Sequence, residues 1–174
     1  MSILIIALPR TGSTELGKRL SINNKFKYEF EPFNPIVGLP PLTNFKNIIL
    51  KTIIFQLPHY IDGENRINWL IELTKKFDET ILLSRKNLTE CAESWSYLNH
   101  KKKQKGFESN QPYFWERTPN YETALENIIK WNDELKFISN ELNIPITYYE
   151  DIYNPTDKGR LRKGNLNDYE KKII

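Results

Sequence analysis

The sequence predicts an α/β fold: a three-layer sandwich with a central, mainly parallel sheet and a phosphate-binding loop after the first strand. Two observations predict the sheet. Short apolar runs alternate with segments whose apolar residues recur at helical spacing. The runs at residues 3–6 (ILII) and 81–83 (ILL) contain no polar residue, as expected of strands that helices cover on both faces. A chain of 174 residues suffices for one domain, which we assign to residues 1–174.

The elements of the first third follow from local patterns. An unbroken apolar run makes residues 2–8 a buried strand, and helical spacing predicts a helix over about residues 13–22. Residues 27–30 (KYEF) are expected to be extended. They lead into residues 32–41, where repeated prolines predict a loop. Residues 47–55 are dense in isoleucine and predict a second long strand.

The rest of the chain repeats the alternation. Apolar residues at helical spacing over 67–77 predict a helix, and residues 80–84 (TILLS) a third buried strand. A helix is expected over 88–98 and a long amphipathic one over 121–142. Residues 144–149 predict a last strand. Ligands of such a sheet gather at the carboxyl ends of its strands.

Composition excludes several classes of protein. An aromatic content of 13% and a hydrophobic content of 39% exclude a disordered chain, and no apolar run is long enough to cross a bilayer. The single cysteine, Cys91, cannot form an internal disulfide, so a reducing, cytoplasmic location is expected. A net charge of +3 permits an anionic ligand but indicates neither a nucleic acid nor a membrane partner.

The segment after the first strand, Pro9-Arg10-Thr11-Gly12-Ser13-Thr14, has the composition of an anion site. Gly12 permits a tight turn, and Ser13 and Thr14 open a helix whose N–H groups and dipole favour negative charge. Arg10 adds a cation that does not deprotonate. A Walker A loop is the competing interpretation, because Gly12 and Gly17-Lys18 have its spacing. Arg19, however, stands where Ser or Thr would hold Mg²⁺.

The P-R-T-G-S-T segment resembles the 5′-phosphosulfate loop of sulfotransferases that use 3′-phosphoadenosine 5′-phosphosulfate (PAPS). A second stretch, ILLSRKNLTECAESWSYL, resembles the family's 3′-phosphate site, in which a strand-end basic residue and a helix serine hold the phosphate. Ser94 is the matching serine, and both Arg85 and Lys86 are candidates for the basic residue. A third stretch, KGRLRKGN, resembles the loop that closes over the cofactor, within a tail at 157–174. Its matching positions are Arg162, Lys163 and Gly164.

The resemblance implies a sulfotransferase that moves a sulfuryl group from PAPS to a hydroxyl or amine of a small-molecule or glycan acceptor, leaving 3′-phosphoadenosine 5′-phosphate (PAP). No metal is implied. Arg10 matches the catalytic basic position and is expected to stabilise charge on the leaving oxygen. Thr11, Gly12, Ser13 and Thr14 are expected to bind the 5′-phosphate end.

Three residues are candidates for the general base that takes the proton of the acceptor. Glu29 and Glu31 lie two apart on an extended segment and are expected on the same side. The Glu-Pro-Phe context of Glu31 resembles that of many family members and favours it, with Glu29 and His59 as alternatives. Lys51, at the end of the second long strand, is a further candidate for the site.

Two other functions stay open. One is a nucleotide or small-molecule kinase of P-loop type on the same three-layer scaffold. The other is a non-catalytic module that binds a nucleotide or polyanion through the basic segments 101–105 and 160–163.

Overall fold

The computed structural model describes residues 1–33, 45–56, 58, 61–102 and 120–153. Its described part contains one sheet with strands in the order β2-β3-β1-β4-β5, and every neighbouring pair is parallel. The strands are β1 (Ile3–Ala7), β2 (Lys27–Phe30), β3 (Ile48–Ile53), β4 (Glu79–Ser84) and β5 (Ile146–Tyr148). The expected α/β class with a central parallel sheet is thereby confirmed.

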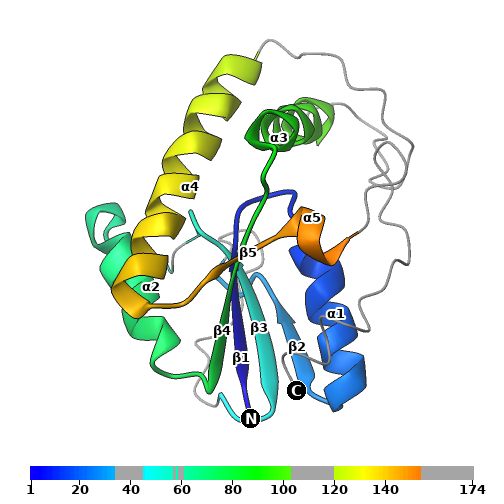
Figure 1. Ribbon diagram of the computed structural model, residues 1–174, viewed down its shortest axis with the longest axis vertical. Coiled ribbons are helices and arrows are strands. Elements are labelled where there is room, and N and C mark those ends of the chain that lie inside the picture. The colour runs from blue at the N-terminus through cyan, green and yellow to red at the C-terminus, as the bar shows by residue number, and fades with distance from the viewer. Residues whose placement is uncertain (34–44, 57, 59–60, 103–119, 154–174) are drawn as a thin grey trace.

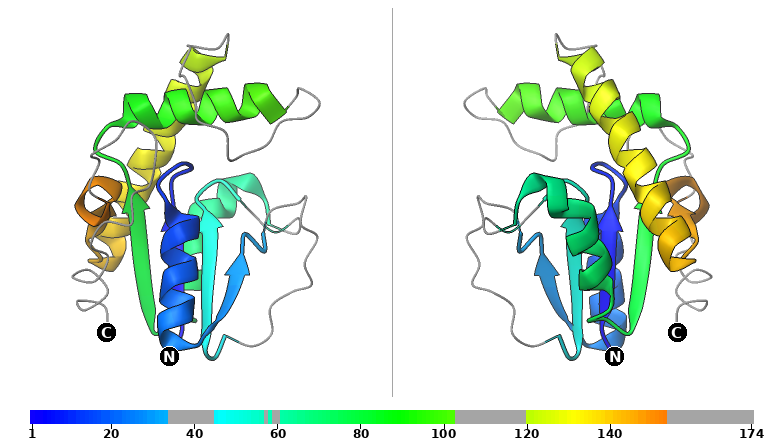
Figure 2. Two further views of the ribbon diagram at one scale, coloured as in Figure 1. Left: turned by 90° about the vertical axis from the view of Figure 1, so that its right-hand side faces the viewer. Right: turned by 90° about the vertical axis from the view of Figure 1, so that its left-hand side faces the viewer.

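Helices cover both faces of this sheet (Figure 1). Helix α1 (Ser13–Asn24) packs on one face, whereas α2 (Arg66–Thr74) and α4 (Tyr121–Leu142) pack on the other. A short 3₁₀ turn, η1 (Gly63–Asn65), precedes α2. Helix α3 (Leu88–Lys102) lies across the carboxyl ends of the strands and packs against α4 (Figure 2). The three layers are therefore α1, the sheet, and α2 with α4.

The central strand β1 explains why its sequence is apolar throughout. Ile3 and Ile5 lie in the core under α1, and Leu4 and Ile6 lie in the core under α2 and α4. All four side chains are fully buried. Because both faces of the strand are covered, no polar position alternates with the apolar ones. None of the helices among the described residues is both long and apolar enough to span a membrane.

The topology sets where a ligand can bind. The chain leaves β1 toward α1 on one face of the sheet, and it leaves β4 toward α3 and then α4 on the other. These two strands are neighbours, and their pairing continues one residue past β1, where the Leu8 N–H donates to the Leu83 carbonyl at 3.0 Å. Adjacent strands whose connections leave to opposite faces open a crevice at their carboxyl ends. The segments after β1 and β4 meet in that position.

Strands β3 and β5 end earlier than expected, each for a local reason. Strand β3 stops at Ile53 because Gln56 N–H turns back to the Ile53 carbonyl at 2.8 Å. Strand β5 stops at Tyr148 because residues 149–152 form a single helical turn, α5 (Tyr149–Ile152), where a strand end was expected. Most of the expected loop at 32–41, and the tail at 157–174, lie outside the described residues.

Candidate functional site

The loop after β1 is shaped by two residues in the left-handed region. Arg10 has φ 63° and Gly12 has φ 71°. A non-glycine residue at positive φ is strained, so Arg10 is held there by its surroundings. The Thr11 hydroxyl donates to the Leu8 carbonyl at 2.8 Å, which closes the turn. Gly12 is the N-cap of α1 and has no side chain to cap the first turn, so the N–H groups there are left to other acceptors or a ligand.

Gly12 is also required because aromatic side chains press on it. A Cβ at this position would lie 2.8 Å from the Tyr153 ring and 3.2 Å from the Tyr149 ring. The Tyr153 hydroxyl donates to the Gly12 carbonyl at 3.1 Å. The Tyr149 ring also stacks on Arg85, whose guanidinium carbon lies 4.6 Å from the ring centroid. Helix α5 and the residue after it therefore connect the β1 loop to the end of β4.

The β1 loop and helix α3 are in direct contact. Arg10 Nε donates to Ser94 Oγ at 2.8 Å, and Arg85 Nη1 donates to the Arg10 carbonyl at 3.4 Å. The buried Cys91 thiol donates to the Pro9 carbonyl at 3.0 Å. The structure thus brings together Arg10, Arg85 and Ser94, which the sequence placed in two separate phosphate sites.

The two neighbouring basic residues after β4 lie in different surroundings. The Arg85 side chain is 10% exposed and pairs with Glu90 at 3.0 Å, while Glu150 lies 3.8 Å from its Nε. Lys86 is more than half exposed, and its ammonium pairs with Asp151 on the outer side. The hydrogen bond to Asp151 raises the pKa of Lys86. Arg85 therefore lies beside the β1 loop, and the Lys86 side chain is engaged elsewhere.

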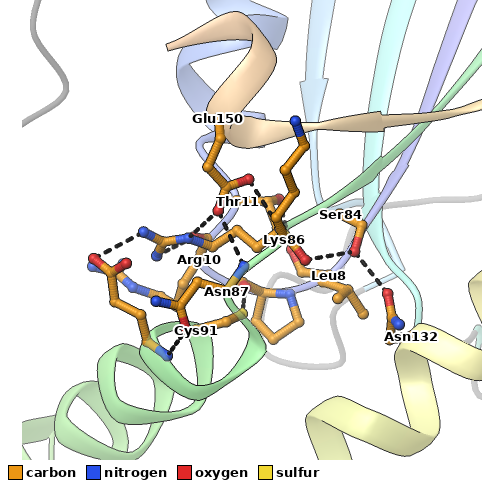
Figure 3. A network of polar contacts seen from close by, with 12 residues as sticks. Leu8, Arg10, Thr11, Ser84, Lys86, Asn87, Cys91, Asn132 and Glu150 are labelled. Carbon is orange, nitrogen blue, oxygen red and sulfur yellow. Dashed lines mark hydrogen bonds and ion pairs between the residues drawn. The ribbon is translucent and has the colours of Figure 1, made fainter. Parts of the chain in front are cut away.

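Glu150 fixes the turn between β4 and α3. Its carboxylate accepts from the Lys86 N–H at 2.9 Å and from the Asn87 N–H at 3.3 Å. Two backbone donors near a helix start are thereby satisfied, and a carboxylate there is favoured by the helix dipole. On the other side, the buried Asn132 of α4 accepts from the Ser84 hydroxyl at 2.7 Å. The backbone that carries Arg85 is held from both sides (Figure 3).

A second polar cluster lies at the ends of β2 and β3. Lys51 is only 2% exposed, and its ammonium pairs with the Glu31 carboxylate and lies over the Phe30 ring. The other Glu31 oxygen accepts from Gln56 Nε2 at 2.7 Å. Burial lowers the pKa of Lys51, Glu31 opposes this shift, and the charge of Arg10 adds to it. Strand β3 pairs with β1, and the Ile54 N–H donates to the Ala7 carbonyl at 3.0 Å, so this cluster lies beside the end of β1.

Glu29 does not belong to that cluster, so the expectation that Glu29 and Glu31 share a side was wrong. Glu29 pairs with Lys27, and its register partner, Leu50, lies in the core under α2 and α4. Glu31 follows the strand with φ 48°, in the left-handed region. The strand alternation therefore ends at Phe30, and the Glu31 carboxylate reaches Lys51 instead.

The glycine-lysine pair of the Walker A interpretation lies inside α1. A Cβ on Gly17 would collide with the Tyr28 ring, so packing explains why this residue is a glycine. Lys18 is exposed on the helix surface. Among the described residues, no three His, Cys, Asp or Glu side chains gather as ligands of a metal ion would.

Some predicted site residues lie outside the described part of the chain, and some residues of the site were not predicted from the sequence. His59, Arg162, Lys163 and Gly164 lie outside the described residues, so their roles stay predictions. Sequence reasoning missed the contacts of Gln56, Glu90, Asn132, Tyr149, Glu150 and Tyr153. Glu90 could have been identified from the sequence, because it precedes Ser94 by four residues and the two therefore share a face of α3. The others depend on contacts between segments far apart in the chain.

Comparisons with known proteins add little on function. No family model and no curated protein matches the chain. A solved shikimate kinase from Acinetobacter baumannii in complex with shikimate is similar, with a TM-score of 0.49 and 13% identity over 99% of this chain and 90% of that one. A gluconokinase from Sinorhizobium meliloti 1021 has a TM-score of 0.33 and 10% identity over 82% and 95%. Both are kinases, the class of one open alternative, but a likeness this slight carries no argument about function.

Proposed function

We propose that the chain is a PAPS-dependent sulfotransferase, which moves a sulfuryl group to a hydroxyl or amine of a small-molecule or glycan acceptor. The observation that supports it is the contact of Arg10 with Ser94 and of Arg85 with the Arg10 carbonyl. A nucleoside that carries phosphate on both its 5′ and 3′ positions needs two anion sites close together. The β1 loop and the start of α3 offer two such sites beside one another.

In this proposal the β1 loop binds the 5′ end of the donor. The N–H groups of the first turn of α1, with Ser13 and Thr14, hold the 5′-phosphate. Arg10 stabilises the charge that grows on the oxygen linking phosphorus to sulfur as the bond from that oxygen to sulfur breaks. The acceptor oxygen or nitrogen forms the new bond to sulfur, and its proton passes to a base.

Glu31 and Lys51 supply charge on the acceptor side. Lys51 lies on β3, the neighbour of β1, and in this proposal its ammonium faces the sulfuryl oxygens during transfer. Glu31 is our candidate base. Because an adjacent ammonium stabilises a carboxylate and makes it less basic, Glu31 would take up the acceptor proton as Lys51 moves toward the transferring group. Glu29, paired with Lys27, and His59 are the alternatives.

The 3′ end of the donor is assigned to Arg85 and Ser94. A phosphate dianion suits a guanidinium and a hydroxyl donor together. Lys86 is not assigned to it, since its ammonium pairs with Asp151. Arg162, Lys163 and Gly164 complete the proposed cofactor site, in a part of the chain outside the described residues.

Isothermal titration calorimetry tests the proposal with three ligands: PAP, adenosine 5′-phosphate, and ATP with Mg²⁺. We expect PAP to bind most tightly, with the same affinity in EDTA. Preference for ATP with Mg²⁺ would instead indicate the kinase alternative. Equal weak binding of all three would indicate a module that binds polyanions without catalysis.

A further inference from the structure

Arg85 is balanced by carboxylates from two elements. Glu90 of α3 reaches its Nη2 at 3.0 Å, and Glu150 of α5 lies 3.8 Å from its Nε. Arg85 Nε has no hydrogen-bond partner in the described part of the chain. An unpaired guanidinium as buried as this one would be costly, so the two carboxylates keep the site stable without a ligand.

The two carboxylates differ in how firmly they are held. Glu150 is 20% exposed and accepts from the Lys86 and Asn87 N–H groups, so it cannot leave without uncovering two donors. The Glu90 side chain is 40% exposed and is anchored through its pair with Arg85. It can rotate into water without uncovering a backbone donor, once another anion takes its place beside Arg85. Glu90 is therefore the carboxylate that a ligand can replace.

Glu90 also lies where the proposed 3′-phosphate would bind. It precedes Ser94 by four residues on α3, so both side chains emerge on one face of the helix. That face meets Arg85 through Glu90 and Arg10 through Ser94. A phosphate held jointly by Arg85 and Ser94 would meet the Glu90 carboxylate, and two anions cannot share these donors.

We propose that Glu90 is a displaceable counter-ion that occupies the 3′-phosphate position until the nucleotide binds; this rests on the proposed function. A phosphate dianion brings more charge and more acceptor oxygens to Arg85 than one carboxylate does, so it displaces Glu90. A 3′-hydroxyl has no charge and leaves Glu90 in place. The displacement lowers affinity for the spent nucleotide, which still carries its 3′-phosphate, and so favours product release.

The test is calorimetric titration of the full chain with PAP and with adenosine 5′-phosphate. Glu90→Gln should bind PAP about twofold to fivefold more tightly than wild type, the size expected for losing a partly exposed ion pair. Its affinity for adenosine 5′-phosphate should not change. Glu90→Ala should give the same two results. It is included because the glutamine of Glu90→Gln can still accept a hydrogen bond from Arg85, whereas alanine cannot. Asp151→Asn is the matched control, since it removes one charge from the exposed pair with Lys86 and should change neither affinity.

Weaker or unchanged PAP binding in both Glu90 variants would overturn the proposal, as would an equal gain in Asp151→Asn. Titration with inorganic phosphate separates this result from failure of the sulfotransferase assignment. If wild type binds neither nucleotide, the assignment fails. The role of Glu90 then stands if Glu90→Gln binds inorganic phosphate more tightly than wild type, and falls if it does not.

Discussion

Replacing Glu31 by glutamine should destabilise the protein strongly, because it leaves the Lys51 ammonium buried without its counter-charge. Lys51 is 2% exposed, and burial already lowers its pKa against the pull of Glu31. Removing one partner of a buried ion pair costs about 3–5 kcal/mol. We expect the lower end, about 3 kcal/mol, since glutamine keeps an oxygen that can accept from Lys51. For a chain of this length that loss lowers Tm by about 6–12 °C.

The loss of stability caused by Glu31→Gln should become smaller as pH rises. The folded pKa of Lys51 lies below its unfolded value of about 10.4. Between these two values the unfolded chain binds more protons than the folded one, so stability rises with pH there. Without Glu31 the folded pKa falls further and the window widens. The variant should therefore recover part of its deficit as pH rises toward the unfolded pKa of lysine.

Urea unfolding at pH 7 and pH 9.5 measures both effects. Glu29→Gln is the matched control, because its partner Lys27 is exposed and the loss should stay below about 1 kcal/mol. The double variant Glu31→Gln/Lys51→Met should recover much of the stability, since it removes the buried charge. An equal loss in the two single variants, or a deficit that does not change with pH, would refute the reasoning.

Two further predictions concern the β1 loop and α1. Arg10→Ala should lower kcat for sulfuryl transfer by about 10²–10³ while PAP affinity falls less, because Arg10 acts on charge that grows in the transition state. Single-turnover transfer from PAPS, measured beside equilibrium binding, checks this; a normal kcat with a raised KM would make Arg10 a binding residue. Gly17→Ala should cost about 1–3 kcal/mol in urea unfolding, because its Cβ would press into the Tyr28 ring. Unchanged stability would show that the ring moves aside readily.

Much of the fold could be predicted because its signals are local. The apolar run of β1 and the glycine at position 12 are each visible within a few residues. The parallel order follows from strands that are buried on both faces. The helical turn of α5 was not predicted, because residues 149–152 continue a β-rich segment, and the contacts of α5 with Gly12 and Arg85 lie far away in the sequence.

The sequence predicts which segments form the candidate site, but not which residues within them contact one another. Arg85 and Lys86 are adjacent and chemically alike, and what separates them is Asp151, 65 residues further on. Glu29 and Glu31 share a side in a regular strand, but the left-handed backbone of Glu31 breaks that regularity. The pairing of Glu31 with Lys51 and Gln56 depends on the register of β2 with β3. Such contacts arise from the tertiary structure, which local patterns do not encode.

The most direct test of the account is the affinity that the 3′-phosphate adds, measured as the ratio of the Kd for adenosine 5′-phosphate to that for PAP. Arg85→Ala should reduce this ratio about tenfold or more, because charge-assisted hydrogen bonds to the 3′-phosphate are lost. Lys86→Ala, which removes an equal charge from the neighbouring residue, should leave the ratio unchanged, since its ammonium pairs with Asp151. An equal effect of the two substitutions, or no effect of Arg85→Ala, would contradict a single site formed by the β1 loop and the start of α3.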